Sequence, residues 1–401
     1  MSKLDDLINK LCPDGVEYKT LGELGEFYGG LTGKGKNDFI DGNAKFITYM
    51  NVYKNLKLKL DVPEKVKINP GEKQRTLEYG DVLFTGSSET PDECGISSVL
   101  ADKTDEKLYL NSFCICFRFN DPTIFNPEFS KYLFRSQELR VQIGKTASGV
   151  TRFNVSKEKM KKVIVPIVPL EIQNEIVRIL DNFTELEEEL EEELEARRKQ
   201  YEYYRDSLLT FDDNVEWKKL GDIATRIKGT PITATQMKLI AADNGEIKIF
   251  AGGKTVVNAH ESDIPNANIT KVPAVLVQSR GTIDFVYYDK PFTFKNEMWA
   301  YTFENQITVK YIYYVLKNNV EHFRKITESM GAFPQIALPD TEKYKVPLPD
   351  IKAQEKIVNI LDRFEALCND ITSGLPAEIE ARHKQYEYYR DKLLTFKRKS
   401  A

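Results

Sequence analysis

Cysteine and histidine are scarce in this 401-residue sequence, which contains five cysteines and three histidines. The cysteines are odd in number and scattered, which excludes a disulfide scaffold and indicates reduced thiols, as in a cytoplasmic protein. No histidine is spaced with a cysteine or another histidine as a metal-binding pair, and Cys114 and Cys116 lack further ligands nearby. The sequence therefore predicts no metal site.

Long hydrophobic runs are also missing. No apolar stretch approaches the ~18 residues of a membrane helix, and the first residues lack the apolar segment of a secretory signal. Apolar residues make up 41% of the chain and charged residues 29%, which is the balance of a globular protein. The length then predicts two or three domains, with no membrane segment and a cytoplasmic location.

The net charge is only −4, but it is unevenly distributed. Residues 16–165 hold 23 basic and 20 acidic side chains, and residues 215–345 hold 17 and 14, so each segment carries +3. Residues 166–211 hold 5 basic and 13 acidic side chains, mostly because of ELEEELEEELE at 185–195. Two mildly basic segments allow a nucleic-acid partner without requiring one.

The sequence repeats itself once. ARRKQYEYYRDSLLTF at 196–211 matches ARHKQYEYYRDKLLTF at 381–396 in 14 of 16 positions. Upstream, QNEIVRILDNF parallels QEKIVNILDRF, and near the start of each half VEYKTLGEL parallels VEWKKLGDI. This period is far longer than the ~20–50 residues of a solenoid repeat, so two complete modules are expected. We predict domains at 1–165 and 212–345, each followed by a helical segment, at 166–211 and 346–401.

Each helical segment has one apolar stripe. Its apolar residues recur at three- and four-residue steps, while the other faces are charged. One stripe requires one partner, and we predict that the two segments pack as an antiparallel pair. Ser-Gly-Leu-Pro at 373–376 occurs only in the second copy and should kink or break that helix. The residues expected to pack the pair or to dock another subunit are Leu186, Leu190, Leu194, Tyr201, Tyr204, Leu208, Tyr386, Tyr389 and Leu393.

The two modules share one pattern of strand-like and helix-like segments. DVLFTGSS at 81–88 matches AVLVQSRG at 274–281, and NSFCICFRF at 111–119 matches NEMWAYTF at 296–303. A further strand is expected at 45–50, and helices at 129–143 and 307–326. The predicted fold class is α+β, with two similar mixed α/β domains joined by two long helices packed as an antiparallel pair.

Three segments approach motifs of enzymes without completing them. The Gly-rich stretch at 29–34 has neither the spacing nor the Ser/Thr of a phosphate loop. Asn-Pro-Glu-Phe at 126–129 approaches the Asn-Pro-Pro-aromatic loop of adenine methyltransferases but fits a helix start better, and the acidic cluster at 339–343 fits a solvated turn. A methyltransferase or nuclease with unrecognised motifs, or a coiled-coil protein-binding scaffold, remains as an alternative.

Four motifs of the chain are distinctive when taken together. They are QYEYYRD-x-LLTF after a Glu/Leu-rich helix, the preceding VPLP-x-I-x-x-Q-x-x-IV-x-ILD-x-F, SGLPAEI-x-AR, and LCPDGVEYKTLGEL near the start. This combination resembles the specificity subunits of Type I restriction-modification systems. The resemblance implies two target-recognition domains that each read half of a bipartite double-stranded DNA target. It further implies two modification subunits, which methylate adenine with S-adenosylmethionine, and two restriction subunits driven by ATP with Mg²⁺. The chain itself would bind no cofactor and have no catalytic residues.

Side chains in the loops between strands are the expected DNA contacts, because loops place groups against both phosphates and base edges. Arg152 is a candidate for guanine and Gln335 for adenine, since these pairings are bidentate. The candidates in the first module are Lys34, Lys36, Ser87, Ser88, Thr146, Ser148 and Arg152. Those in the second module are Lys228, Lys254, Ser279, Arg280, Met330 and Gln335.

Overall fold

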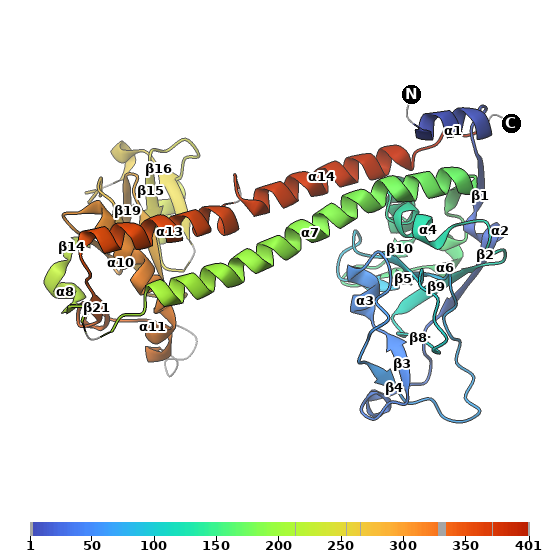
Figure 1. Ribbon diagram of the computed structural model, residues 1–401, viewed down its shortest axis with the longest axis horizontal. Coiled ribbons are helices and arrows are strands. Elements are labelled where there is room, and N and C mark those ends of the chain that lie inside the picture. The colour runs from blue at the N-terminus through green and yellow to red at the C-terminus, as the bar shows by residue number, and fades with distance from the viewer. Residues whose placement is uncertain are drawn as a thin grey trace. The chain divides into compact units, whose positions relative to one another are not determined.

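The computed structural model describes residues 3–212, 214–253, 255–264, 266–327, 334–370 and 372–399, which form two compact units. The first unit comprises residues 1–190 and 379–401, and the second comprises residues 191–378. Each unit contains one mixed α/β module and a part of the long helix α7 (Leu170–Leu208), as Figure 1 shows. The predicted fold class is confirmed.

The first module is built around a four-stranded antiparallel sheet in the order β2-β9-β5-β7. Helices of this module cover one face, and the core between them includes Phe84, Phe117 and Phe129. A three-stranded sheet, β4-β3-β8, forms a second layer with its own core around Ile47 and Leu83. The four-stranded sheet consists of β2 (Gly25–Gly29), β9 (Cys114–Phe119), β5 (Val82–Thr85) and β7 (Ser97–Val99).

The remaining elements of the first unit connect or flank these sheets. The strands are β1 (Glu17–Thr20), β3 (Ala44–Ile47), β4 (Lys65–Val66), β6 (Ser87–Ser88), β8 (Tyr109–Leu110), β10 (Ala147–Ser148), β11 (Phe153–Val155) and β12 (Ile164–Ile167). The helices are α1 (Lys3–Leu11), α2 (Leu21–Leu24), η1 (Lys36–Phe39), α3 (Tyr49–Lys54), α4 (Pro127–Leu133), α5 (Gln137–Gly144) and α6 (Lys157–Met160).

The second module repeats this plan with the sheet order β14-β20-β17-β18. A parallel pair occurs at the same place in both modules, β3 with β8 in the first and β15 with β19 in the second. The strands are β13 (Trp217–Lys219), β14 (Thr225–Lys228), β15 (Ile247–Phe250), β16 (Val256–Ala259), β17 (Ala274–Gln278), β18 (Asp284–Tyr288), β19 (Phe292–Phe294), β20 (Trp299–Thr302) and β21 (Lys345–Pro347). The helices are α8 (Leu220–Ile223), α9 (Ala234–Leu239), η2 (Glu261–Asp263), α10 (Gln306–Asn318), α11 (Val320–Ile326) and α12 (Leu338–Glu342).

Three sequence-based boundaries differ from the structure. The helix expected at 129–143 is interrupted at Ser136, whose backbone is extended and whose hydroxyl donates to the Leu133 carbonyl at 2.7 Å. The helix expected at 307–326 is interrupted at Asn319, whose side chain donates to the Val315 carbonyl at 2.8 Å. The strand expected at 45–50 ends at Ile47, because Thr48 caps helix α3.

The helical segments differ as the sequence predicts. Helix α7 is continuous over 39 residues, whereas the second segment is divided into α13 (Ile351–Asn369) and α14 (Leu375–Leu393). Gly374 lies at the division, where a Cβ atom would come within 2.4 Å of the Ala366 carbonyl oxygen. Only glycine fits there, so the predicted break at Ser-Gly-Leu-Pro is confirmed.

Helix α7 pairs antiparallel with α14 in the first unit and with α13 in the second. In the first unit Phe183 stacks on Tyr389 at 5.3 Å, and Glu187, one turn further along α7, contacts His383, earlier in α14. In the second unit Tyr204 stacks on Phe364 at 5.6 Å. Phe183 and Phe364 are repeat equivalents, as are Tyr389 and Tyr204, so the same pair forms twice with the helices exchanged.

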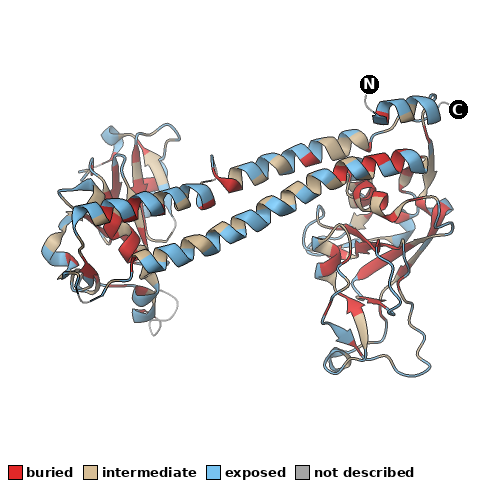
Figure 2. Ribbon diagram, in the orientation of Figure 1, coloured by how far each residue is buried: buried red, intermediate tan, exposed pale blue. Residues whose placement is uncertain are grey.

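A buried tyrosine fixes each module to its helix. The Tyr132 hydroxyl donates to Asp181 at 2.6 Å, and the Tyr314 hydroxyl donates to Asp362 and, at 2.8 Å, to Glu365. Burial raises the pKa of both phenols, so the hydroxyls stay protonated as donors. Figure 2 shows the buried positions of α7 gathered near its start, where it packs on the first module: Ile172, Gln173, Glu175, Ile176 and Leu180.

The C-terminal segment of the first unit bonds to its N-terminal segment. The Val16 backbone N–H donates to the Lys397 carbonyl at 2.8 Å, and the Lys399 N–H donates to the Val16 carbonyl at 2.9 Å. The Tyr18 hydroxyl adds a bond to the Phe396 carbonyl at 3.0 Å. Strand β1 therefore begins beside the end of the second LLTF sequence.

Candidate nucleic-acid interface

A small three-stranded sheet gathers most of the first module's candidate residues. Strand β11 pairs with β6 on one side and with β10 on the other, which aligns Ser87, Asn154 and Ser148 in one row. The Arg152 Nη2 atom donates to the Ser87 Oγ at 3.1 Å, and its guanidinium lies 5.4 Å from the centre of the exposed Phe113 ring. The structure thus brings two predicted segments, 87–88 and 146–152, to one edge and adds Asn154 and Phe113, which sequence reasoning missed.

Two hydroxyls of this group face inward. The Thr146 side chain is buried and donates to the Ile143 carbonyl at 2.7 Å, so it is committed to the fold. Ser87 is also buried, and the half-buried Ser88 donates to Glu93 at 2.9 Å. Asn154, Ser148 and Arg152 are exposed, as is Phe113, so another molecule can reach these side chains.

The two lysines of the Gly-rich loop lie elsewhere, beside β4. The Lys34 side chain is 5% exposed, and its ammonium donates to the Lys67 carbonyl and pairs with Glu72 at 2.6 Å. Its hydrogen bond is the main reason why the pKa of Glu72 falls to about 2. Lys34 therefore holds the loop closed, whereas Lys36 in η1 is exposed.

In the second module, Arg280 and Gln335 lie side by side although 55 residues separate them. The Arg280 Nε and Nη2 atoms donate to the Gln335 Oε1 at 3.2 and 2.7 Å, and both side chains are exposed. The adjacent Ser279 is buried and donates to the Glu297 carbonyl at 3.0 Å. Lys254 and Met330 lie outside the described residues.

The edges of the two modules occupy equivalent positions. The Val155 N–H donates to the Gly86 carbonyl at 2.9 Å, and the Ile336 N–H donates to the Ser279 carbonyl at 3.0 Å. The next residue pair in each register is Ser87 with Asn154 and Arg280 with Gln335. The same backbone arrangement therefore carries different hydrogen-bonding side chains in the two modules.

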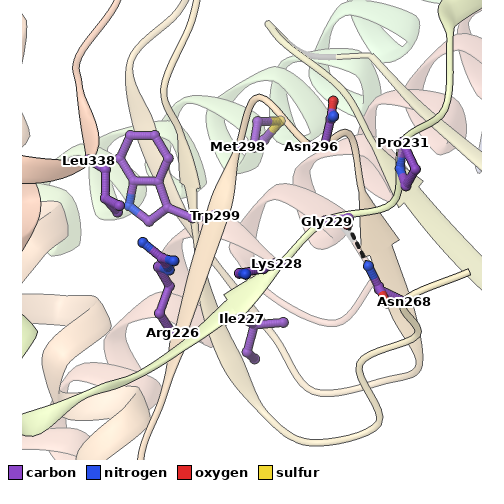
Figure 3. A pocket seen from close by; sticks show the side chains of 10 residues that line it. All are labelled: Arg226, Ile227, Lys228, Gly229, Pro231, Asn268, Asn296, Met298, Trp299 and Leu338. Carbon is purple, nitrogen blue, oxygen red and sulfur yellow. Dashed lines mark hydrogen bonds between the residues drawn. The ribbon is translucent and has the colours of Figure 1, made fainter.

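A cavity of about 490 Å³ lies on the second module beside edge strand β14. Figure 3 shows Lys228 between Arg226 on one side and Asn268 on the other. The Arg226 guanidinium lies 3.6 Å from Glu342, and Asn268 donates to the Gly229 carbonyl at 2.8 Å. The other lining residues are Ile227, Gly229, Pro231, Asn296, Met298, Trp299 and Leu338.

Two segments that approach enzyme motifs in the sequence belong to ordinary helices in the structure. Asn126 caps helix α4 by accepting the Glu128 N–H at 2.9 Å, and the segment at 339–343 lies in and after the short helix α12. Within the described ranges, no three His, Cys, Asp or Glu side chains lie together as a metal site, and no helix is long and apolar enough to cross a membrane. The cysteines are buried free thiols, and burial raises the pKa of Cys114 to about 12.

Two copies of one mixed module, each fixed to an antiparallel helix pair and each with a different polar edge, define a duplicated recognition protein. The chain belongs to the family described as Type I restriction modification DNA specificity domain, which matches residues 13–196 and 213–381. The resemblance found in the sequence is thereby confirmed.

Named relatives agree with the family. The chain is 38% identical over 266 residues to the Type I restriction enzyme EcoR124I/EcoR124II specificity subunit of Escherichia coli, covering 60% of this chain and 65% of that protein. It is 34% identical over 276 residues to a putative type I restriction enzyme specificity subunit of Haemophilus influenzae, covering 62% and 68%. The match thus spans just under two thirds of the E. coli protein.

Solved structures share the fold. The S subunit of a Type-I restriction-modification system from M. genitalium has a TM-score of 0.57 at 17% identity, covering 95% of this chain and 96% of that one. A chain from a study of complex assembly and conformational transition of the type I R-M system has a TM-score of 0.59 at 15% identity, covering 95% and 98%.

Proposed function

We propose that this chain is the DNA sequence-recognition subunit of a Type I restriction-modification complex. It reads a bipartite, asymmetric double-stranded target, with one half-site for each module, and is not itself an enzyme. The observation that carries the proposal is the pair of equivalent edges, Ser87 with Asn154 and Arg280 with Gln335. Different donors and acceptors on one backbone arrangement are what two modules need to read different bases.

The chemistry of each edge suits base contacts. Arg280 presents a fork of N–H donors that matches the two acceptors of guanine. The Gln335 amide would match the donor and acceptor of adenine only when its oxygen is released from Arg280. In the first module Arg152 and Asn154 offer the same two chemistries. The exposed Ser148 adds a hydroxyl that can bind bases or phosphates.

The helix pair is the proposed docking surface for two modification subunits, which bind S-adenosylmethionine and methylate adenine. Packing within the pair uses Tyr386, Tyr389, Tyr201 and Leu208, which contact the module cores or the opposite helix. The equivalent Tyr203 and Tyr388 are 70% and 61% exposed. Tyr203 and Tyr388 are repeat equivalents, so these outward tyrosines offer the same group twice. The half-buried Leu186, Leu190 and Leu194 lie only in α7, Leu393 packs against the first core, and Tyr204 stacks on Phe364.

Two restriction subunits, which use ATP and Mg²⁺, complete the proposed cytoplasmic complex. This chain supplies recognition to them and holds no cofactor of its own. The rival proposals assign the chain its own methyltransferase or nuclease activity, or protein binding without DNA.

Exchange of one module tests the proposal. The chain is combined with its modification subunit and labelled S-adenosylmethionine, and residues 16–165 are replaced by the first module of another family member. One half of the methylated sequence should change while the other stays, because each module reads its own half. Methylation by the chain alone, or a change in both halves, would contradict the proposal.

A further inference from the structure

Strands β2 and β14 are equivalent edge strands, and their registers align residue by residue. Gly29 pairs with Ile115 in the first module, and Lys228 pairs with Trp299 in the second. Ile115 also pairs with Phe84 of β5, and Trp299 also pairs with Val277 of β17. Phe84 and Val277 match when 81–88 is aligned with 274–281, so Ile115 and Trp299 are equivalent. Position 228 therefore carries a lysine where the first module has glycine.

The connection after the polar edge shows the opposite exchange. Lys157 is the first residue of α6 and follows Asn154 by three positions, and Leu338 is the first residue of α12 and follows Gln335 by three. The first module thus carries a lysine here where the second has leucine.

The two exchanges concern one place on the module surface. A Cβ atom built on Gly29 would lie 3.5 Å from the Lys157 Nζ, so the Lys157 ammonium occupies the space beside the glycine. In the second module Lys228 and Leu338 line the same cavity (Figure 3). Each module therefore presents one ammonium group at this place, but from different elements.

Packing does not explain this arrangement. Both lysines are exposed, and within the described part of the chain neither ammonium group forms a hydrogen bond or ion pair. A side chain with no internal partner does not stabilise the module through a specific contact. A positive charge that recurs at one place in both modules, although its carrier differs, is instead what a shared anionic ligand requires.

We propose that Lys157 and Lys228 are equivalent contacts to DNA phosphates, each beside the base-reading edge of its own module. The inference rests on the proposed function, because it concerns the same DNA. A lysine ammonium is a flexible point charge that can bind a phosphate from either element, whereas a base contact would depend on the direction of approach. The contact thus positions the duplex without reading its sequence.

The test measures binding of the full chain to a fluorescent duplex of mixed sequence over a range of salt concentrations. Lys228→Ala should make the salt dependence shallower by about 0.9 in the slope of log K against log salt, the value for one phosphate contact. Between about 50 and 200 mM salt, the variant should lose about 3.5-fold less affinity than the unaltered chain does. Lys157→Ala should behave alike.

Rescue by the exchanged position distinguishes a defined contact from general charge. Adding Leu338→Lys to Lys228→Ala moves the lysine to the position used by the first module and should restore the slope. Lys290→Ala is the matched control, because this exposed lysine precedes β19 beyond β18, the opposite edge of the sheet from β14. Thermal unfolding of each variant establishes that it is folded.

Each outcome decides one question. If the unaltered chain binds no duplex, the proposed function fails. If it binds but folded Lys228→Ala and Lys157→Ala keep the original slope, only the phosphate contacts are refuted. If the slope falls and Leu338→Lys does not restore it, or Lys290→Ala lowers it equally, the equivalence of the two lysines is wrong.

Discussion

Replacement of Arg280 by alanine should relax the recognition of one base pair in the second half-site. The guanidinium has five N–H groups, and the Nε and Nη2 atoms each direct one of them to Gln335. Three N–H groups remain, on Nη1 and Nη2, which are the atoms that can face the two acceptors of guanine. Gln335 therefore orients the fork and leaves it free to bind a base.

The expected loss follows from that geometry. One bidentate base contact contributes about 1–3 kcal/mol of discrimination, so Arg280→Ala should reduce the preference at one position by about 5- to 150-fold. Gln335→Ala should reduce it by less, because the arginine stays but loses its orienting partner. The two effects should be less than additive in the double variant, since both act on one contact.

The assay compares affinities for duplexes in which each base pair of the methylated half-site is replaced in turn. Arg280→Lys is the matched control, because it keeps the charge and loses the fork, so it should relax the same position while retaining the salt slope. A uniform loss of affinity at all positions, with a slope shallower by about 0.9, would refute the base contact and indicate a phosphate contact.

Two further changes test the helices. Tyr314→Phe removes a buried hydroxyl that donates to Asp362 and Glu365, and should lower the free energy of unfolding by about 2 kcal/mol in urea titrations; an unchanged value would show that the bonds add nothing. Insertion of Leu-Glu-Glu-Glu after Glu195 lengthens α7 by about 6 Å and turns it by about 400°, which nearly preserves the stripe. At about 3.4 Å per base pair, the unspecified gap between half-sites should grow by one or two pairs, as sequencing of methylated sites would reveal, and an unchanged gap with full activity would show that α7 does not set it.

The sequence predicts most of the fold because its repeat can be compared with itself. The apolar run at 274–277 follows Pro273 and ends before the polar Gln278 and Ser279, and strand β17 covers Ala274–Gln278. The interruptions at Ser136 and Asn319 escape prediction, since the apolar pattern continues through both. A hydrogen bond from one side chain to the preceding turn ends each helix, and periodicity does not record it.

Some residues of the candidate site can be predicted from the sequence, and others cannot. Arg280 and Gln335 are found from residue type alone and prove to be neighbours. Lys34 looks like a phosphate ligand in a Gly-rich loop, but its partner Glu72 is 38 residues away in sequence. Asn154 is missed because its importance depends on the strand register that pairs it with Ser87. Lys157 is missed because its ammonium group lies beside Gly29, which is far away in the sequence.

The bonds of Val16 with Lys397 and Lys399 give the chain a circular topology. At the end of the first LLTF sequence, the backbone runs on covalently into the second module. At the end of the second, the equivalent step into the first module is made by hydrogen bonds instead. The two repeats thus follow one another in a closed cycle. The order of the two modules along the chain depends only on the position in that cycle at which the backbone is interrupted.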